Sequence, residues 1–170
     1  MKKLVLFTLI AGLFTSLNSS AQQDKSKRPS PPAKVSQTLT SGAEISIDYS
    51  RPSMRGRSMT ELVPAGKVWR TGANEATVFE TSKDVTIQGK KLPAGKYSLY
   101  TIPGDKEWTI IFNKTWNQWG TIYKDAEDVL RVNVKPGKSD KFTEMMTFDI
   151  SKNGQVSLNW ANTKVGFKVQ

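Results

Sequence analysis

The sequence predicts an all-β domain, an antiparallel β-sandwich of the jelly-roll or immunoglobulin-like kind with about 9 to 11 short strands. Three observations predict it. Segments with period-two alternation of apolar and polar residues follow one another from residue 35 onward, turn residues separate them, and no stretch keeps a helical period. In 43–50, for example, Ile45, Ile47 and Tyr49 fall on one face of a strand.

The connectors between the expected strands carry turn chemistry. Gln88-Gly89 and Asn153-Gly154 are two of them, and Asn153-Gly154 predicts a two-residue type I′ hairpin, because both central positions of that turn need positive φ. A short helical turn is expected within 121–128. Strands are expected over 43–50, 67–71, 76–81, 85–88, 96–102, 108–113, 129–135, 142–150, 155–160 and 164–169.

The N-terminal part is expected to lie outside the domain. Two lysines and an apolar run open the chain, and small residues follow them, which is typical of a signal peptide over 1–21 with cleavage before Gln22. The segment 22–34 is polar and Pro-rich and predicts a disordered leader, so 35–170 is expected to form one domain. The apolar run is too short for a membrane span and no Cys at the cleavage point could carry a lipid, so we expect a periplasmic or secreted protein.

The composition removes several classes of chemistry. The chain has no Cys and no His, which excludes disulfides, catalytic triads that use His, and zinc sites with Cys or His ligands. A Ser-Lys nucleophile in the S-x-x-K spacing is also absent. We therefore expect no metal and no cofactor and favour a non-catalytic role, although carboxylates, Lys, Tyr and Ser/Thr remain available for catalysis.

The charge points to anionic partners. The net charge is +10 at pH 7, and a basic surface attracts anions. The export signal and the lack of any nucleic-acid-binding motif argue against nucleic acid, so anionic envelope polymers or acidic small molecules fit better. The alternative remains that scattered lysines only keep the protein soluble.

The first candidate site is the loop "SRPSMRGR", residues 50–57. It contains Arg51, Arg55 and Arg57, and arginines separated by Gly and Ser can donate paired hydrogen bonds to carboxylate, phosphate or sulfate oxygens. The competing interpretation is that these arginines are solvated or pair with acids of the same domain.

The second candidate site is "WRTGANEAT", residues 69–77. Gly72 and Asn74 predict a bend there, since both tolerate the left-handed region. We expect Trp69 to be a core anchor. Arg70, Asn74 and Glu75 form either a polar network that fixes the bend or part of a binding site.

The third candidate site is "NKTWNQWG", residues 113–120. Trp116 and Trp119 flank two amides, an arrangement that suits the apolar faces and hydroxyl edges of a sugar. A loop that covers one end of the core with its two tryptophans explains the same pattern.

Four stretches, "YSRPSMRGR", "LVPAGKVWRTGANEAT", "KKLPAGKYSLYTIPGDKEWTIIFNKTWNQWG" and "DVLRVNVKP", resemble a family of exported Gram-negative bacterial proteins catalogued as a domain of unknown function. The resemblance covers roughly 35–150. It implies a periplasmic or secreted bacterial protein and implies no reaction. This chain departs from the family at 58–61, where Ser58-Met59-Thr60-Glu61 stands in place of an aromatic-Gly pair.

These observations favour an exported, non-catalytic binding or structural domain that recognises an anionic or carbohydrate envelope ligand through an arginine-rich cleft. One alternative is a carboxylate-dependent hydrolase of cell-envelope glycan, with Glu75 as the acid and Asp48 as its partner, because such enzymes use two carboxyls in one cleft. Another alternative is an envelope assembly or chaperone factor, which needs an exposed strand edge. The candidate ligand-binding residues are Arg51, Arg55, Arg57, Arg70, Asn74, Glu75, Trp116 and Trp119.

Overall fold

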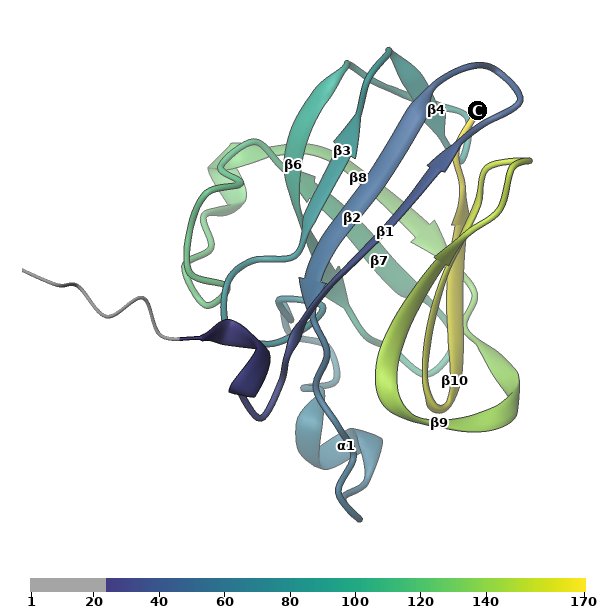
Figure 1. Ribbon diagram of the computed structural model, residues 1–170. Helices are drawn as coiled ribbons and strands as arrows, with labels where there is room; N and C mark the ends of the chain where they lie inside the picture. The colour runs from purple at the N-terminus through teal and green to yellow at the C-terminus, as the bar shows by residue number, and fades with distance from the viewer. Residues whose placement is uncertain (1–23) are drawn as a thin grey trace, which may run out of the picture.

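The computed structural model describes residues 24–170, so the predicted signal peptide, 1–21, and the predicted first mature residue, Gln22, lie outside the described residues. The described part is all-β and antiparallel, and its strands form two packed layers (Figure 1), which confirms the predicted sandwich-like fold class. No helix within the described part is long and apolar enough to cross a membrane. In chain order the elements are the 3₁₀ helix η1 (Lys25–Lys27), β1 (Pro32–Thr38), β2 (Glu44–Ser50), α1 (Met59–Leu62), β3 (Val78–Thr81), β4 (Val85–Ile87), β5 (Lys90–Leu92), β6 (Gly95–Ile102), β7 (Trp108–Asn113), the 3₁₀ helix η2 (Asp125–Glu127), β8 (Asp128–Val134), β9 (Gly137–Ile150) and β10 (Gln155–Lys168).

The first layer is a six-stranded antiparallel sheet with the order β1-β2-β3-β6-β7-β8. The alternation read from the sequence sets its two faces. In β2, Ile45, Ile47 and Tyr49 are buried, whereas Glu44 is exposed on the other face. The prediction for this strand is confirmed, because a half-buried strand needs one apolar and one polar face.

The second layer consists of two hairpins that join along one edge. In the hairpin β9-β10 the two strands pair with each other, and the residues that follow β10 pair with β4 through the bridge Ile87↔Val169. Thr86 and Gln170 exchange two backbone hydrogen bonds of 2.6 and 2.9 Å. Figure 1 shows this layer crossing in front of the end of the larger sheet, with the C-terminus beside β4.

Aromatic rings fill the space between the layers. Phe79 of β3 and Phe112 of β7 meet edge-to-face with 5.1 Å between their centroids, and Phe112 meets Phe167 of β10 at 5.7 Å. All three side chains are at most 3% exposed. Because no disulfide is available to the chain, burial of such rings is the main source of stability.

The leader differs from the expectation. The expected disordered segment reached residue 34, but β1 already begins at Pro32 and pairs with Ser50. The strand was missed because it is an edge strand whose only apolar side chains after Pro32 are those of Ala33 and Val35. Pro is tolerated at the first residue of such a strand, where no ladder donor is needed.

Two further assignments are corrected by the structure. The expected strand over 67–71 is absent apart from a single bridge, Trp69↔Thr101. The two expected strands over 155–160 and 164–169 are one strand, β10, which continues through an irregularity at Ala161 with φ 50°. A bulge of this kind lets a strand continue with a local bend.

The type I′ turn lies at a different hairpin from the one predicted. Gln88 and Gly89 both have positive φ, 50° and 80°, and join β4 to β5 as a two-residue type I′ turn. The type I′ prediction for Asn153-Gly154 was wrong, because only Gly154 has positive φ. There the Gly154 N–H donates to the Ser151 carbonyl at 2.8 Å, which makes a longer loop closed by a glycine in the left-handed region.

We expect Phe112→Ala to lower the free energy of unfolding by about 3–5 kcal/mol, because it leaves a cavity among three aromatic rings. Phe142→Ala is the matched control, since Phe142 is 56% exposed and its loss should change stability by less than about 0.5 kcal/mol. Denaturant unfolding measures both. Equal losses for the two variants would contradict this account of the core.

Candidate functional site

Aromatic packing anchors the bend that begins at Trp69. The Trp69 side chain is buried, stacks nearly parallel on Trp160 of β10 at 5.8 Å, and meets Trp108 of β7 edge-to-face at 6.3 Å. Each such pair adds about 0.5–1.5 kcal/mol beyond area burial. The expectation that Trp69 is a core anchor is confirmed.

The backbone of the bend is strained. The prediction of a left-handed residue is confirmed at Asn74, φ 59°, but the second left-handed residue is Thr71, φ 52°, rather than Gly72. Such a conformation in a β-branched residue costs about 1–3 kcal/mol and persists only where the surroundings fix it. The Thr71 hydroxyl donates to the Trp69 carbonyl at 3.2 Å, and the Thr77 hydroxyl donates to the Thr71 carbonyl at 2.9 Å.

The second and third candidate segments lie side by side. Glu75 and Trp119 form an isolated antiparallel bridge. The Gly120 N–H donates to the Asn74 carbonyl, and the Ala76 N–H donates to the Gln118 carbonyl, both at 3.0 Å. The bend and the tryptophan loop are therefore one structural unit, although 40 or so residues separate them in the chain.

Glu75 does not pair with the arginines of the candidate site. Its carboxylate accepts from Arg28 at 2.9 Å and forms an ion pair with Lys25, also at 2.9 Å. Burial alone would raise the pKa of the Glu75 carboxyl, but the hydrogen bonds and charges of Lys25 and Arg28 outweigh it and lower the pKa to about 2. The partners come from the segment that was expected to be a disordered leader.

The arginine-rich loop is tied to its surroundings in three different ways. Arg51 donates to the Met146 carbonyl at 3.0 Å and to Thr147 Oγ1 at 2.8 Å on β9. Arg55 is exposed and donates to the carbonyl of Pro29 at 3.3 Å. Arg57 donates back to the Met54 and Ser53 carbonyls at 3.1 and 3.0 Å. Within residues 24–170 none of these guanidiniums forms a salt bridge. Acids are nevertheless close to the loop, since the Glu144 carboxylate accepts from the Arg55 backbone N–H at 2.8 Å and the charge of Arg57 acts on the carboxylates of Glu61 and Glu144.

Two of the predicted arginines share one cavity, which we name the arginine cavity. It measures about 590 Å³, within the range of small-molecule sites. No Asp or Glu is among the described residues that line it, so the positive charges of Arg57 and Arg70 are not compensated inside it. The lining includes Arg57, Arg70, Trp69, Tyr100, Tyr123 and Trp160.

Gly120 determines where Arg70 lies. A Cβ on Gly120 would come within 2.6 Å of Arg70 Cδ and 2.8 Å of the Asn74 carbonyl oxygen. The missing side chain leaves room for the Arg70 stem, which crosses Gly120 on its way to the cavity. The Arg70 Nε donates a long bond, 3.3 Å, to the Gly72 carbonyl, and within residues 24–170 its terminal nitrogens make no hydrogen bond and can therefore donate to a ligand.

The two phenols of the arginine cavity are not bases at neutral pH. Burial, together with the hydrogen bond to Asp128, raises the pKa of Tyr123 to about 12. Burial also raises the pKa of Tyr100, whose hydroxyl donates to the Ile122 carbonyl at 2.8 Å. With both phenols protonated, the cavity presents aromatic surface and cations but no proton acceptor for general-base catalysis.

The other predicted residues lie outside the arginine cavity. Asn74 donates to the Ser30 carbonyl at 3.0 Å and fixes the leader beside the bend. Trp116 and Trp119 are 39% and 47% exposed, and Lys96 Nζ lies 4.9 Å from the Trp116 ring centroid. Asp48 pairs with Lys34 at 2.9 Å, so it and Glu75 are each held by their own cations rather than together.

Sequence reasoning missed three of the rings that line the arginine cavity, Tyr100, Tyr123 and Trp160. They come from β6, from the loop before η2 and from β10, and no local motif links these segments to the arginines. Within residues 24–170, no cluster of three acidic side chains could hold a metal ion.

We expect Gly120→Ala to lower the free energy of unfolding by about 1–3 kcal/mol, because the added Cβ would clash with the backbone carbonyl of Asn74, which cannot move aside as a side chain can. Gly137→Ala is the matched control, since its Cβ would meet nothing closer than 3.8 Å. Denaturant unfolding compares the two. A Gly120→Ala variant as stable as Gly137→Ala would contradict the close packing of Gly120 against Arg70 and Asn74.

The depressed pKa of Glu75 predicts a pH dependence. Its ion pairs contribute stability that is complete above the ordinary pKa of 4.5 and is lost as the pH falls through the folded pKa of about 2. The stability difference between wild type and Glu75→Gln should therefore be largest near pH 7 and shrink steadily between pH 4.5 and 2. Glu107→Gln, which removes an exposed carboxylate that forms no salt bridge within the described residues, is the matched control. A difference that does not change with pH would contradict the assignment of these ion pairs.

Comparison with known proteins agrees with the resemblance noted from the sequence motifs. Searches of curated proteins and of solved structures each found no match. A family model matches residues 30–169, which includes both layers of the sandwich and the arginine cavity. The chain therefore belongs to the family of proteins of unknown function DUF2911.

Proposed function

We propose that the protein is an exported, non-catalytic binding protein whose arginine cavity takes a small anionic ligand with an aromatic or apolar body. The observation that carries the proposal is that Arg57 and Arg70 line one cavity together with four aromatic rings and without a carboxylate. Guanidiniums suit carboxylate, phosphate or sulfate groups, and the rings suit the rest of such a molecule. The N-terminal sequence pattern supports export.

The electrostatics of the cavity favour binding an anion over binding a neutral molecule. Arg70 is half-buried beside apolar rings, so its guanidinium gains more from a bound anion than it would in open solvent, because the local dielectric is lower. Arg57 is exposed and adds a second positive charge at the cavity. The backbone carbonyls at Arg57 take only part of its donors. A ligand anion can therefore bind without breaking an existing ion pair.

The hydrolase alternative receives less support. A glycosidase acid needs a raised pKa and a second carboxyl nearby. Glu75 has a pKa of about 2, and Asp48 is paired with Lys34. Glu75 is therefore ionised throughout the physiological range and cannot donate a proton to a leaving group.

The assembly-factor alternative also receives less support. Both edges of the six-stranded sheet carry features that discourage strand addition. The β1 edge begins with Pro32 and exposes Lys34, and at the β8 edge Lys90 Nζ donates to the Arg131 carbonyl at 3.2 Å. Pro and Lys at a sheet edge are common devices against pairing with another chain.

Calorimetric titration with phenyl phosphate, with phenol as its neutral analogue, tests the proposal. Phenyl phosphate should bind more tightly than phenol, and Arg57→Ala and Arg70→Ala should each weaken it by about tenfold or more, because a hydrogen bond to a charged group contributes about 1.5–3 kcal/mol. Arg55→Ala is the matched control, since Arg55 lies outside the cavity lining, and should bind as wild type.

Thermal unfolding accompanies the titration, and each variant should melt within a few degrees of wild type, since neither Arg57 nor Arg70 has a salt bridge to lose within the described residues. Equal loss of binding in Arg55→Ala and Arg57→Ala would overturn the assignment of the arginine cavity. So would binding of phenol as tight as that of phenyl phosphate.

A further inference from the structure

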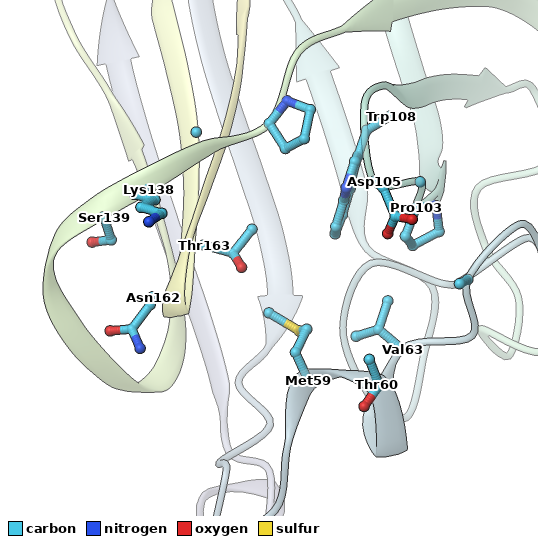
Figure 2. A pocket seen from close by; sticks show the side chains of 14 residues that line it. Met59, Thr60, Val63, Pro103, Asp105, Trp108, Lys138, Ser139, Asn162 and Thr163 are labelled. Atoms are coloured by element: carbon cyan, nitrogen blue, oxygen red, sulfur yellow. The ribbon is translucent and has the colours of Figure 1, made fainter.

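A second and larger cavity opens at one end of the sandwich, and we name it the end cavity. It measures about 730 Å³ and lies where α1, the β6-β7 turn and the start of β9 meet the middle of β10. None of the residues expected to bind a ligand lines it. Figure 2 shows its lining side chains.

An irregularity in the β9-β10 hairpin creates this opening. Between the pairs Ala161↔Thr143 and Thr163↔Lys138 the register slips, so that a longer stretch of β9 faces a shorter stretch of β10. Ala161 has φ 50° at this point. Bulges of this kind occur often beside functional sites, because they redirect side chains and end regular pairing. Here the bulge brings Asn162 and Thr163 to the cavity wall.

The end cavity has one apolar wall and one polar wall. The Trp108 ring stands on one side with Pro103 and the carboxylate of Asp105 beside it, and Met59, Val63 and Thr60 lie below. The opposite side carries polar groups (Figure 2), namely those of Lys138, Ser139, Asn162 and Thr163.

The polar groups of the end cavity are free to meet a ligand. Within residues 24–170, the side chains of Ser139, Asn162 and Thr163 make no hydrogen bond to the protein, and Asp105 and Lys138 form no salt bridge. Asp105 and Lys138 are the only charged residues in the lining, and their charges cancel. The end cavity thus differs from the arginine cavity, where two positive charges stand without an acid.

We propose that the end cavity binds a neutral carbohydrate of about disaccharide size. A pyranose ring has an apolar C–H face for the apolar wall, where Met59 is half-buried and Trp108 is 5% exposed, and it has hydroxyls that donate to and accept from Asn162 and Thr163. An acyl chain would leave these polar groups without hydrogen bonds, at a cost for each one. Because the charges of Asp105 and Lys138 cancel in the lining, the end cavity offers an anionic ligand no net attraction.

This proposal does not depend on the anion-binding function, because different residues make the two cavities. They are neighbours nonetheless. Trp108 lines the end cavity, Trp69 lines the arginine cavity, and their rings meet edge-to-face at 6.3 Å. The α1 helix contributes Met59 to the end cavity and Leu62 to the arginine cavity.

The test follows the Trp108 indole N–H resonance by NMR while the full-length mature protein is titrated with cellobiose, maltose and N,N′-diacetylchitobiose. At least one of these neutral disaccharides should shift the resonance in a saturable way. Asn162→Ala and Thr163→Val should each lower the affinity for that disaccharide by about three- to tenfold, because each loses one neutral hydrogen bond. Thr40→Val, a change of the same chemistry in the exposed β1-β2 loop, should leave its affinity unchanged.

Arg57→Ala should also bind the disaccharide as wild type does, which separates this proposal from the one for the arginine cavity. The proposal is overturned if none of the three disaccharides shifts Trp108. It is equally overturned if Asn162→Ala and Thr163→Val both bind as wild type, or if decanoate or glucuronate shifts Trp108 while the neutral sugars do not.

Discussion

The stack of Trp69 on Trp160 is the contact on which the described arrangement depends. It joins the loop that leaves the six-stranded sheet to the long strand β10 of the second layer, with ring planes only 9° apart. Through it the strained bend at Thr71 is fixed, and with the bend come Arg70 and the bridge to the tryptophan loop. The same two rings form part of the arginine cavity. Packing in the core and the shape of the candidate site are therefore set by one pair of side chains.

The basic character of the chain is used in two distinct ways. Some cations hold segments together, as Arg28 and Lys25 do at Glu75 and Arg51 does at β9. Others, Arg57 and Arg70, face a cavity without acidic residues. Net charge alone could not separate these roles, because it describes association and solubility rather than the position of any one group.

The sequence predicted strand positions best where one face of the strand is buried and the other is exposed to solvent. The alternation in β2 and the apolar run of β7 predicted those strands closely, because burial imposes the period of two. The edge strand β1 was missed because an edge strand pairs with only one neighbour and needs little apolar surface, so its sequence shows little alternation. The segment 67–71 was expected to be a strand, but it is a loop apart from one bridge, and a loop can bury the Trp69 ring as well as a strand can.

For the candidate site, sequence proximity was a partial guide. Arg57 and Arg70 come from neighbouring segments, and the structure places them in one cavity. The partner of Glu75 could not be found in this way, since Arg28 is 47 residues away and lies in a segment that looks like a linker. Tyr123 and Trp160 are more distant still, and only the pairing of strands brings them to the arginines. A register slip in β9-β10, which no residue pattern announces, opens the end cavity.

The pairing of β4 with the last residues of the chain affects how the molecule folds. Residues 85–87 lie near the middle of the sequence, and their neighbours at 168–170 follow roughly 80 residues later. Most of the larger sheet, and each of the two hairpins of the second layer, can form from strands that are close in sequence. Joining β4 to the end of β10 instead closes a loop of roughly 80 residues, an entropic cost that slows folding. Until the β9-β10 hairpin packs onto the larger sheet, Phe79 of β3 and Phe112 of β7 lack the cover that Phe167 gives them. A chain with this apolar face uncovered can associate with other chains, so such association competes with completion of the fold.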